Sequence, residues 1–410
     1  MTSPASSAIV SYQEAALVVR REAERMLARP LRQEQLPLLQ AASRVLAEPI
    51  LADRDQPPFA RSTRDGFACR ASELQHGALR IAGLLRAGQP WTGESMRAGE
   101  AVEIMTGAAV PPGADCVFMV EHGTVADGQV RLNGQHSPQP GENIVPAGAE
   151  ARRGDTIIPA GRRLAPAEIA AAAACGAATV RGFARPRVAI LATGDELVEV
   201  AETPLAHQIR NSNSYSLAAQ IAAAGGDPEI FPIVRDEVAE TQDAIRRASA
   251  FDLLLLTGGV SMGRFDYVEP ALLSAGAEFL FTGVRMQPGK PVVFGRLGEN
   301  PFFGLPGNPI STMVTFALFV APLLRSLGGE RDAAPIFRMA RLAEAVEVRT
   351  GLTRFLPARL HSDIQGTTVR RIPWQGSGDL TAAARANAFL VVPEIRDKLG
   401  EGEIVSVLEL

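Results

Sequence analysis

Cysteine and histidine are scarce in this sequence, which has three cysteines and five histidines among 410 residues. Cys69, Cys116 and Cys175 lie far apart, without a CxxC pair and without clustered histidines. This spacing gives no pattern for a metal site. Scattered single cysteines suit a reducing cytosol, and each is expected to be a small buried hydrophobic residue.

The sequence also lacks an excess of charge of either sign and a long hydrophobic run. Its formal net charge is −4, so it has no bulk electrostatic attraction to nucleic acid or acidic membranes. The longest apolar run, Met313 to Leu324, is shorter than a membrane span and contains Pro322. The N-terminal segment from Met1 to Val10 shows no secretory signal. We therefore expect a cytoplasmic protein that binds neither nucleic acid nor a membrane.

The residues that are present describe an ordinary globular protein, with 46% hydrophobic and 21% charged residues. A length of 410 residues predicts two to three domains. Near the start, Ser11 and Glu14 form a capping-box pattern, and apolar residues follow at helical spacing from Tyr12 to Leu27. A second short helix is expected from Leu36 to Leu46.

Glycine and proline punctuate short apolar runs between Gln56 and Gly161, and this pattern predicts β-strands and turns. The expected strands are Leu79–Ile81, Ala101–Ile104, Cys116–Val120 and Gln129–Leu132. After them, Pro166 opens an alanine-rich helix that stops at Cys175-Gly176. The order of these patterns predicts a β-rich module inserted between two helical pieces.

Strands and helices alternate from Arg187 to Gly329, which predicts a doubly wound α/β domain. The expected strands are Val188–Ala192, Ile230–Val234, Leu253–Leu256, Pro291–Phe294 and Phe302–Gly304. The expected helices run from a Ser214 cap to Ala224, from Val238 to Ala250, and from Pro309 to Leu327. Beyond Glu330, five further strands predict a small sandwich or barrel. These strands are Phe337–Leu342, Thr353–Leu360, Thr368–Arg371, Ala388–Val392 and Ile404–Leu408.

The stretch from Asp252 to Asp266 is the centre of the α/β pattern. Four leucines predict a strand buried on both faces, and a glycine-rich loop from Gly258 to Gly263 follows it. Small residues there let backbone N–H groups approach an anion at the carboxyl end of the strand. A tight turn that needs glycine only for its backbone angles is the alternative. The loop also matches the G-x-S-x-G elbow of serine hydrolases, but the histidine after Ser261, His361, lies outside the α/β domain.

Two other loops are expected at the same sheet edge, namely Thr193–Leu197 and Leu305–Pro309. The second loop opens a long helix, whose first N–H groups are free to hold an anion. A lysine, Lys290, lies between prolines just before another strand. Carboxylates beside such loops fit a divalent cation that bridges protein and phosphate, although each one singly also fits a helix cap or turn. These carboxylates are Asp195, Glu196, Asp236 and Asp266.

Two loops of the β-rich module are dense in groups able to hold an oxyanion or a metal. They are Ser62–Ala68 and Glu103–Pro111. The first contains Asp65-Gly66, which is also a common turn sequence.

Together, these segments resemble the molybdopterin molybdenumtransferase family, which includes the MoeA proteins and the E-domain of gephyrin. The resemblance covers nearly the whole chain, and so many short motifs in one order make it highly specific. The motifs are Ser62–Ala68, Glu103–Gly107 with Val110-Pro111, Gly141–Ile144, Thr193–Leu197, Asn211–Asn213, Thr257–Gly263 with Asp266-Tyr267, Pro288–Pro291 and Leu305–Pro309.

The resemblance implies an elongated, homodimeric protein whose subunit has four parts. A discontinuous helical linker and dimerisation domain would comprise residues 8–55 and 150–185, and an inserted β-rich module residues 56–149. A MogA-like α/β domain that binds molybdopterin would comprise residues 186–330, and a small C-terminal β-barrel or sandwich residues 331–410. The fold class implied is therefore multidomain, α/β plus β.

The activity that the resemblance implies is insertion of molybdate into adenylylated molybdopterin, with Mg²⁺-dependent release of AMP. Partners would include a second copy of the chain, the molybdopterin adenylyltransferase and molybdoenzymes. Two alternatives remain: the preceding adenylylation of molybdopterin by ATP, and a non-catalytic pterin-binding scaffold. The loops of Asp65 and Thr106 favour insertion, because single-domain adenylyltransferases lack the inserted module.

Position by position, the resemblance also implies residue roles. Asp65 and Thr106 would face the active site from the partner subunit. Further catalytic roles fall on Glu196, Asp236, Asp266 and Lys290, of which the three carboxylates suit Mg²⁺ and the lysine offsets anionic charge. The residues implied to hold pterin or phosphate are Gly258, Gly259, Ser261, Gly263, Pro306, Gly307, Asn308, Pro309, Arg354 and Ser377. Gln287 departs from the family pattern, because several members have lysine at this position.

Overall fold

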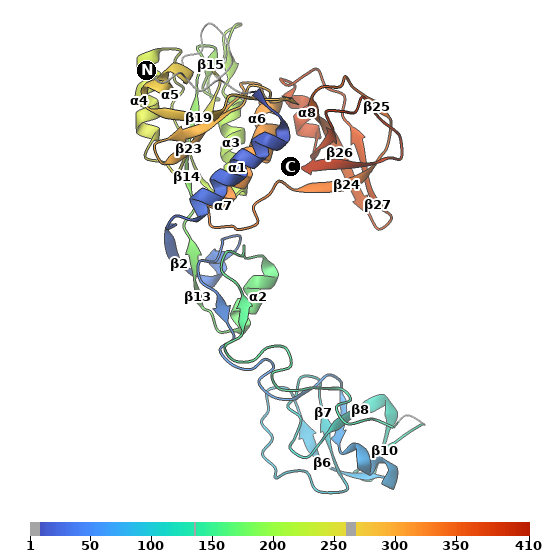
Figure 1. The fold of residues 1–410 in the computed structure, drawn as a ribbon. Coiled ribbons are helices and arrows are strands. Elements are labelled where there is room, and N and C mark those ends of the chain that lie inside the picture. The colour runs from blue at the N-terminus through green and yellow to red at the C-terminus, as the bar shows by residue number, and fades with distance from the viewer. Residues whose placement is uncertain (1–8, 135–136, 260–267) are drawn as a thin grey trace.

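The computed structural model describes residues 9–134, 137–259 and 268–410, and within them the protein is elongated (Figure 1). The α/β domain and a C-terminal barrel lie side by side at one end, and the β-rich module lies at the other. A narrow linker joins the two ends. The multidomain architecture expected from the sequence is therefore confirmed.

The α/β domain contains a six-stranded sheet in the order β17-β14-β18-β23-β22-β19. The first four strands run parallel, whereas β22 and β19 run antiparallel at one edge. The strands are β14 Arg187–Ala192, β17 Asp227–Ile230, β18 Leu253–Thr257, β19 Ala277–Phe281, β22 Val293–Leu297 and β23 Asn300–Leu305. The doubly wound prediction is confirmed. The expected strand Ile230–Val234 is wrong in its bounds, because β17 ends where it was expected to begin.

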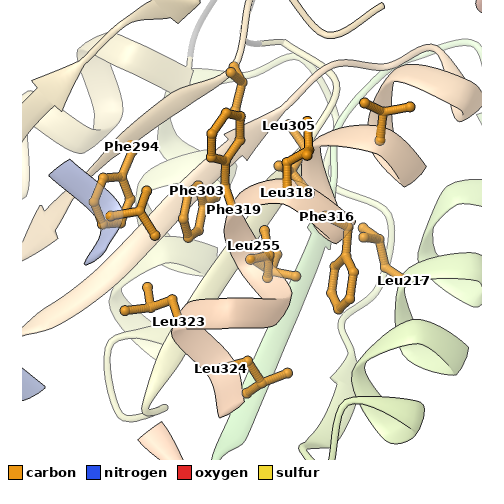
Figure 2. Packing of buried hydrophobic residues seen from close by; sticks show 14 of the residues in the cluster. Leu217, Leu255, Phe294, Phe303, Leu305, Phe316, Leu318, Phe319, Leu323 and Leu324 are labelled. Atoms are coloured by element: carbon orange, nitrogen blue, oxygen red, sulfur yellow. The ribbon is translucent and has the colours of Figure 1, made fainter. Parts of the chain in front are cut away.

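The leucine run of β18 is continuous because both faces of the strand are covered by helices. Leu253 and Leu255 pack in one core with α3, α6 and α7, while Leu254 and Leu256 pack in a second core with α4 and α5. Figure 2 shows Leu255 among aromatic and leucine side chains of the first core, including Phe303. Burial on both faces fixes β18, and with it the start of the glycine loop.

The helices of the α/β domain are α3 Ser212–Ala223, α4 Val238–Ala248, α5 Val268–Ser274, α6 Pro309–Thr315 and α7 Ala321–Leu327. The expected Ser214 cap is wrong, because the Asn211 side chain is the N-cap and accepts a hydrogen bond from the Ser214 N–H at 3.2 Å. The expected long helix from Pro309 to Leu327 is continuous, but it contains a π-helical turn at Phe316–Val320. Pro322 follows that turn and cannot donate a backbone hydrogen bond, so the ladder is interrupted there.

The same helix, Pro309–Leu327, is the one helix among the described residues that is long and apolar enough to cross a membrane. Its most apolar window is 78% buried inside the protein. It therefore packs as a core helix of the α/β domain.

The C-terminal strands form a barrel, which decides between the two expected architectures. They are β24 Phe337–Leu342, β26 Thr353–Asp363, β27 Gly366–Arg371, β28 Ala388–Val392 and β30 Ile404–Glu409. The order β26-β27-β24-β30-β28 is closed by pairing between β28 and β26. A short strand of the α/β domain, β21 Met286–Gln287, pairs with β26 and joins the two domains.

The linker brings together chain segments that are far apart in sequence. Strand β2 Gln33–Pro37 pairs with β13 Thr179–Phe183, and β3 Ile50–Leu51 pairs with β12 Thr156–Ile158. The expected alanine-rich helix is present as α2 Pro166–Ala174. The expected helix from Leu36 to Leu46 is wrong, because that segment forms the end of β2 and a single 3₁₀ turn, Leu38–Ala41.

The N-terminal helix α1, Tyr12–Leu27, has the expected capping box of Ser11 and Glu14. Its buried face, which includes Val19 and Met26, joins the core formed by α7 and the sheet. It therefore packs with the α/β domain rather than with the linker strands. The domain boundaries given above remain a prediction.

The β-rich module contains a six-stranded sheet in the order β8-β5-β7-β6-β10-β9. Its strands are β5 Gly66–Cys69, β6 Leu79–Leu85, β7 Glu100–Ile104, β8 Cys116–Met119, β9 Gly123–Ala126 and β10 Gln129–Leu132. Cys69, Cys116 and Cys175 are all buried and free, as expected. The remaining short elements are β1 Ile9–Val10, β4 Arg61–Ser62, β11 Ile144–Val145, β15 Leu197–Val198, β16 Ile209–Arg210, β20 Gly283–Val284, β25 Val346–Glu347, β29 Lys398–Leu399 and α8 Leu380–Arg385.

Candidate active site

A cavity of about 530 Å³ lies at the carboxyl ends of β14, β18 and β23. This is the edge at which open α/β sheets bind their ligands. Its lining comes from four parts of the α/β domain and from one segment of the barrel domain. The main lining residues are Thr193, Glu196, Asn211, Ser212, Asn213, Thr257, Gly258, Gly307, Asn308, Pro309 and Gly378.

The glycine loop after β18 packs directly on the loop after β14. Gly258 has φ +90°, and a Cβ there would collide with the carbonyl oxygen of Thr193. A Cβ on Gly307 would lie 3.8 Å from the Gly258 Cα, so the third loop is close as well. The sequence expectation that these three loops meet at one sheet edge agrees with this geometry. Glycine is required at Gly258 because both the backbone angle and the close approach exclude a side chain.

Asn213 connects helix α3 to the other two loops. Its side-chain Nδ2 donates hydrogen bonds to the Gly307 carbonyl at 2.7 Å and to the Thr257 Oγ1 at 3.0 Å. The Asn213 Oδ1 and the Thr193 Oγ1 are buried and have no hydrogen-bond partner among the described residues. Neither residue was among the site residues predicted from the sequence. The Asn-Ser-Asn pattern at the start of α3 was a signal for Asn213.

The N-terminus of α6 is held against the barrel domain by Ser377. The Asn308 Nδ2 donates to the Ser377 Oγ at 2.9 Å, and the Ile310 N–H donates to the Ser377 carbonyl at 3.0 Å. The Thr312 Oγ1 donates to the Pro306 carbonyl at 2.6 Å, which fixes the turn before the helix. Ser377 thus reaches this edge, and α3 and α6 both begin at the cavity. The Ile310 N–H is already bonded to Ser377, so the feature of these helix N-termini that favours an anion is chiefly their partial positive charge.

Three carboxylates lie close together beside the cavity. The Asp236 N–H donates to the Asp195 Oδ1 at 3.3 Å. Partial burial raises the pKa of Asp236, and the negative charges of Asp195 and Glu196 raise it further. Among residues 9–134, 137–259 and 268–410, no group of three histidine, cysteine or acidic side chains is arranged to hold a metal ion. Within the described part of the chain, the three carboxylates therefore supply negative charge without a complete ligand set.

Several predicted site residues are not among the described residues that line this cavity. Ser261, Gly263 and Asp266 lie outside the described residues. Lys290 is exposed near the junction of the two domains, and Arg354 is the register partner of Gln287 where β21 meets β26. The Arg354 guanidinium donates to the Arg349 carbonyl at 2.9 and 3.1 Å. Within the part of the chain that the structure describes, neither cation lines the cavity.

Asp65 and Thr106 are brought together in the β-rich module. The Asp65 Oδ1 accepts hydrogen bonds from the Thr106 backbone N–H at 2.6 Å and from the Thr106 Oγ1 at 2.8 Å. These two hydrogen bonds hold the pKa of Asp65 below its ordinary value, and the bond from the backbone N–H has the larger effect. Both residues are exposed. Their module lies at the end of the molecule opposite the α/β domain (Figure 1). One chain therefore does not bring this pair to its own cavity.

Three family models match the chain in sequence order. The MoeA N-terminal region (domain I and II) matches residues 10–176, and a probable molybdopterin binding domain matches residues 189–326. The MoeA C-terminal region (domain IV) matches residues 339–410.

Individual proteins are similar over nearly the whole chain. The molybdopterin molybdenumtransferase of Haemophilus influenzae is 33% identical over 383 residues, covering 92% of this chain and 94% of the relative. That of Bacillus subtilis is also 33% identical over 383 residues, covering 92% and 89%. The solved molybdopterin biosynthesis moeA protein from Pyrococcus horikoshii OT3 has a TM-score of 0.81 at 26% identity, covering 98% of this chain and 100% of the other. The chain therefore belongs to the molybdopterin molybdenumtransferase family.

Proposed function

We propose that the protein inserts molybdate into adenylylated molybdopterin, with Mg²⁺-dependent release of AMP, as a step of molybdenum cofactor biosynthesis. The observation that carries this proposal is the meeting of two helix N-termini and a glycine loop at one cavity. That arrangement suits the phosphate groups of an adenylylated substrate. The names of the Haemophilus and Bacillus relatives support the transferase activity.

The carboxylates beside the cavity fit Mg²⁺ as a cofactor that arrives with the substrate. Mg²⁺ is usually held by one or two carboxylates plus substrate phosphates, so a complete protein ligand set is not required. Glu196 and Asp236 are the proposed Mg²⁺ ligands among the residues that the structure describes. Asp266 is the third proposed ligand. The raised pKa of Asp236 reflects burial and neighbouring negative charge, which a cation would relieve. When bound, Mg²⁺ would neutralise charge on the phosphate.

The other residues bind and orient the two substrates. Ser377 and Asn308 fix the start of α6, and Asn213 fixes the spacing of the loops that would hold the phosphate and pterin. Lys290 and Arg354, at the junction of the α/β domain and the barrel, would offset the charge of the anionic groups. Gln287, beside Arg354, supplies a neutral side chain at this junction.

A homodimer would complete the site with Asp65 and Thr106 of the second copy. This proposal is supported by the position of the two residues, which are hydrogen-bonded to each other at the far end of an elongated molecule. A C2 dimer with the chains side by side in opposite directions would place each β-rich module near the other copy's cavity. We also propose that the protein acts in the cytoplasm and needs neither a membrane nor nucleic acid.

The test follows AMP release from purified protein mixed with adenylylated molybdopterin and Mg²⁺, with and without molybdate. Release that molybdate stimulates, with molybdenum retained on the pterin, is the expected result. Formation of the adenylylated product from ATP and free molybdopterin, without release, would instead assign the adenylylation step. Tight pterin binding with neither reaction would assign a scaffold.

A further inference from the structure

The joint between the linker and the α/β domain contains a carboxylate held by two arginines. Glu330, which follows α7, has a side chain that is only 12% exposed. Its Oε2 accepts hydrogen bonds from the Arg163 Nη2 at 2.9 Å and the Arg163 Nε at 3.0 Å. The same oxygen accepts from the Arg325 Nε at 3.0 Å, and the Oε1 accepts from the Arg325 Nη2. Arg163 comes from the linker and Arg325 from α7, so the carboxylate ties two parts of the chain.

Arg163 makes two further contacts that cross the same joint. Its Nη1 donates to the Ser43 carbonyl in the linker at 2.8 Å, and its Nη2 donates to the Ala224 carbonyl at the end of α3 at 3.2 Å. The guanidinium therefore has partners on both sides of the joint. Its planar fork fixes angles as well as distances, which a lysine ammonium would not.

The backbone at the joint leaves little room for a different orientation. Gly329, with φ +86°, lies against the ring of Phe183 from β13, and a Cβ at that position would collide with the ring. A second ion pair across the joint, Arg32 with Asp252 at 2.8 Å, is more exposed, so water weakens it more. The buried carboxylate with its two arginines is therefore the most specific contact between the linker and the α/β domain.

We infer that Arg163 and Glu330 form a latch that sets the direction of the arm, and so positions Asp65 and Thr106 for the reaction. The arm is the linker together with the β-rich module, which extends away from the α/β domain as a single projection (Figure 1). Because the module lies at the end of this arm, a small rotation at the latch becomes a large displacement of the Asp65 loop. The two latch residues act through that loop and are positioning residues. This inference rests on the proposed function, in which the Asp65 loop meets a second copy's cavity.

The direction of the arm can be measured without activity. The three native cysteines are buried, so spin labels can be placed on new cysteines at Gln129 in the module and Ala239 in α4. Labelled chains diluted with an excess of unlabelled protein report intrachain distances by double electron–electron resonance. We expect one narrow distance distribution in the parent protein and a broad one in Glu330→Gln and Arg163→Lys. If both variants keep the narrow distribution, the latch is wrong.

Arg162→Gln is the matched control. Arg162 is the neighbouring residue and forms an ion pair with Glu168 at 2.8 Å, but both partners lie within the linker. This variant loses an arginine ion pair without touching the joint, so its distribution should stay narrow. Arg163→Lys keeps the positive charge, which keeps the test valid if Glu330→Gln fails to fold.

Kinetics then separate positioning from plain stability. Both latch variants should lower kcat for molybdate-dependent AMP release about tenfold or more, because reacting groups are misplaced. Their Kd for AMP alone should stay within about twofold, because the cavity is distant from the joint. A broad distance distribution with unchanged kcat would reject the positioning role. Absence of AMP release in the parent protein would count against the proposed function only, since the distance measurement still decides the latch.

Discussion

The Asp65 carboxylate is held by one residue, Thr106, which donates two hydrogen bonds to the same oxygen. The second carboxylate oxygen has no protein partner among the described residues and is free to face a substrate. We expect Asp65→Ala to lower AMP release by about a hundredfold or more, with little change in unfolding temperature, because the side chain is exposed. Glu121→Ala, an exposed acidic residue on the same module, is the control. Near-normal release by Asp65→Ala would remove this residue from the site.

The hydrogen bonds from Thr106 also predict a pH effect. They hold the pKa of Asp65 below its ordinary value, so the carboxylate stays ionised at mildly acidic pH. Thr106→Val removes the hydroxyl but keeps the backbone N–H, so the pKa of Asp65 should rise. The acid limb of the kcat/KM profile should then move to higher pH, whereas Thr106→Ser should leave it in place. An unchanged acid limb in Thr106→Val would show that Asp65 ionisation does not limit the reaction.

Replacement of Asp236 should have opposite effects on the stability of the fold and on activity. Its pKa is raised by burial and by the charges of Asp195 and Glu196, so ionised Asp236 costs folding free energy at neutral pH. The sign for a raised folded pKa is that stability is highest at low pH and falls as pH rises through that pKa. Asp236→Asn should therefore raise the free energy of unfolding at pH 7.

The same Asp236→Asn variant should need more Mg²⁺ for half-maximal AMP release, since it loses a carboxylate that we propose as a Mg²⁺ ligand. Chemical denaturation and a Mg²⁺ titration measure the two effects on one preparation. Asp243→Asn on α4, whose carboxylate pairs with Arg246, provides the control for removal of an acidic residue from the same domain. Unchanged Mg²⁺ dependence in Asp236→Asn would leave Asp236 as a residue that only shapes the loop.

At the scale of elements, the turn after β18 sets the cavity. Gly258→Ala should destabilise the fold by roughly 2 to 4 kcal/mol, because the new Cβ meets the Thr193 carbonyl and the backbone angle is unfavourable. Gly276→Ala is matched, with φ +83° and no atom within 4 Å of the new Cβ, so it should cost about 1 kcal/mol. Urea denaturation measures both. Equal losses would show that the contact with Thr193 adds nothing.

Elements whose signal is local were predictable from the sequence. The bounds of β24 and β28 in the barrel match the expected strands, because apolar runs bounded by turn residues fix them. The segment from Leu36 to Leu46 was mistaken for a helix because its first two residues, Leu36 and Pro37, pair with β13, more than a hundred residues away. Tertiary pairing overrides local propensity at such positions. Strand β19 was missed at the antiparallel edge of the sheet.

The candidate site likewise contains some features that the sequence predicts and others that it does not. The three loops around the cavity were predictable because parallel strands place their carboxyl ends at one edge. Asn213 was not, since its role depends on contacts with Gly307 and Thr257 that span 94 and 44 positions of the chain. The pairing of Asp65 with Thr106 spans 41 positions and likewise follows from the sheet, in which β5 and β7 lie side by side.

At the scale of the whole molecule, the long arm is the feature on which the proposed dimer rests. The held pair of Asp65 and Thr106 lies at one end, and the cavity lies at the other (Figure 1). If each site combines the cavity of one copy with the module of the other, Asp65→Ala and Glu196→Ala inactivate different halves of the site. The two variants should then complement each other within a dimer.

Co-expression of Asp65→Ala and Glu196→Ala chains with different tags allows the mixed dimer to be purified. In that dimer one site combines the Glu196→Ala cavity with the Asp65→Ala module and is dead. The other site has both native residues, so the mixed dimer should recover about half of the parent AMP release. Each variant alone should be inactive, which serves as the control. No recovery in the mixed dimer would place both residues in one chain's site, and the arm would then need a different role.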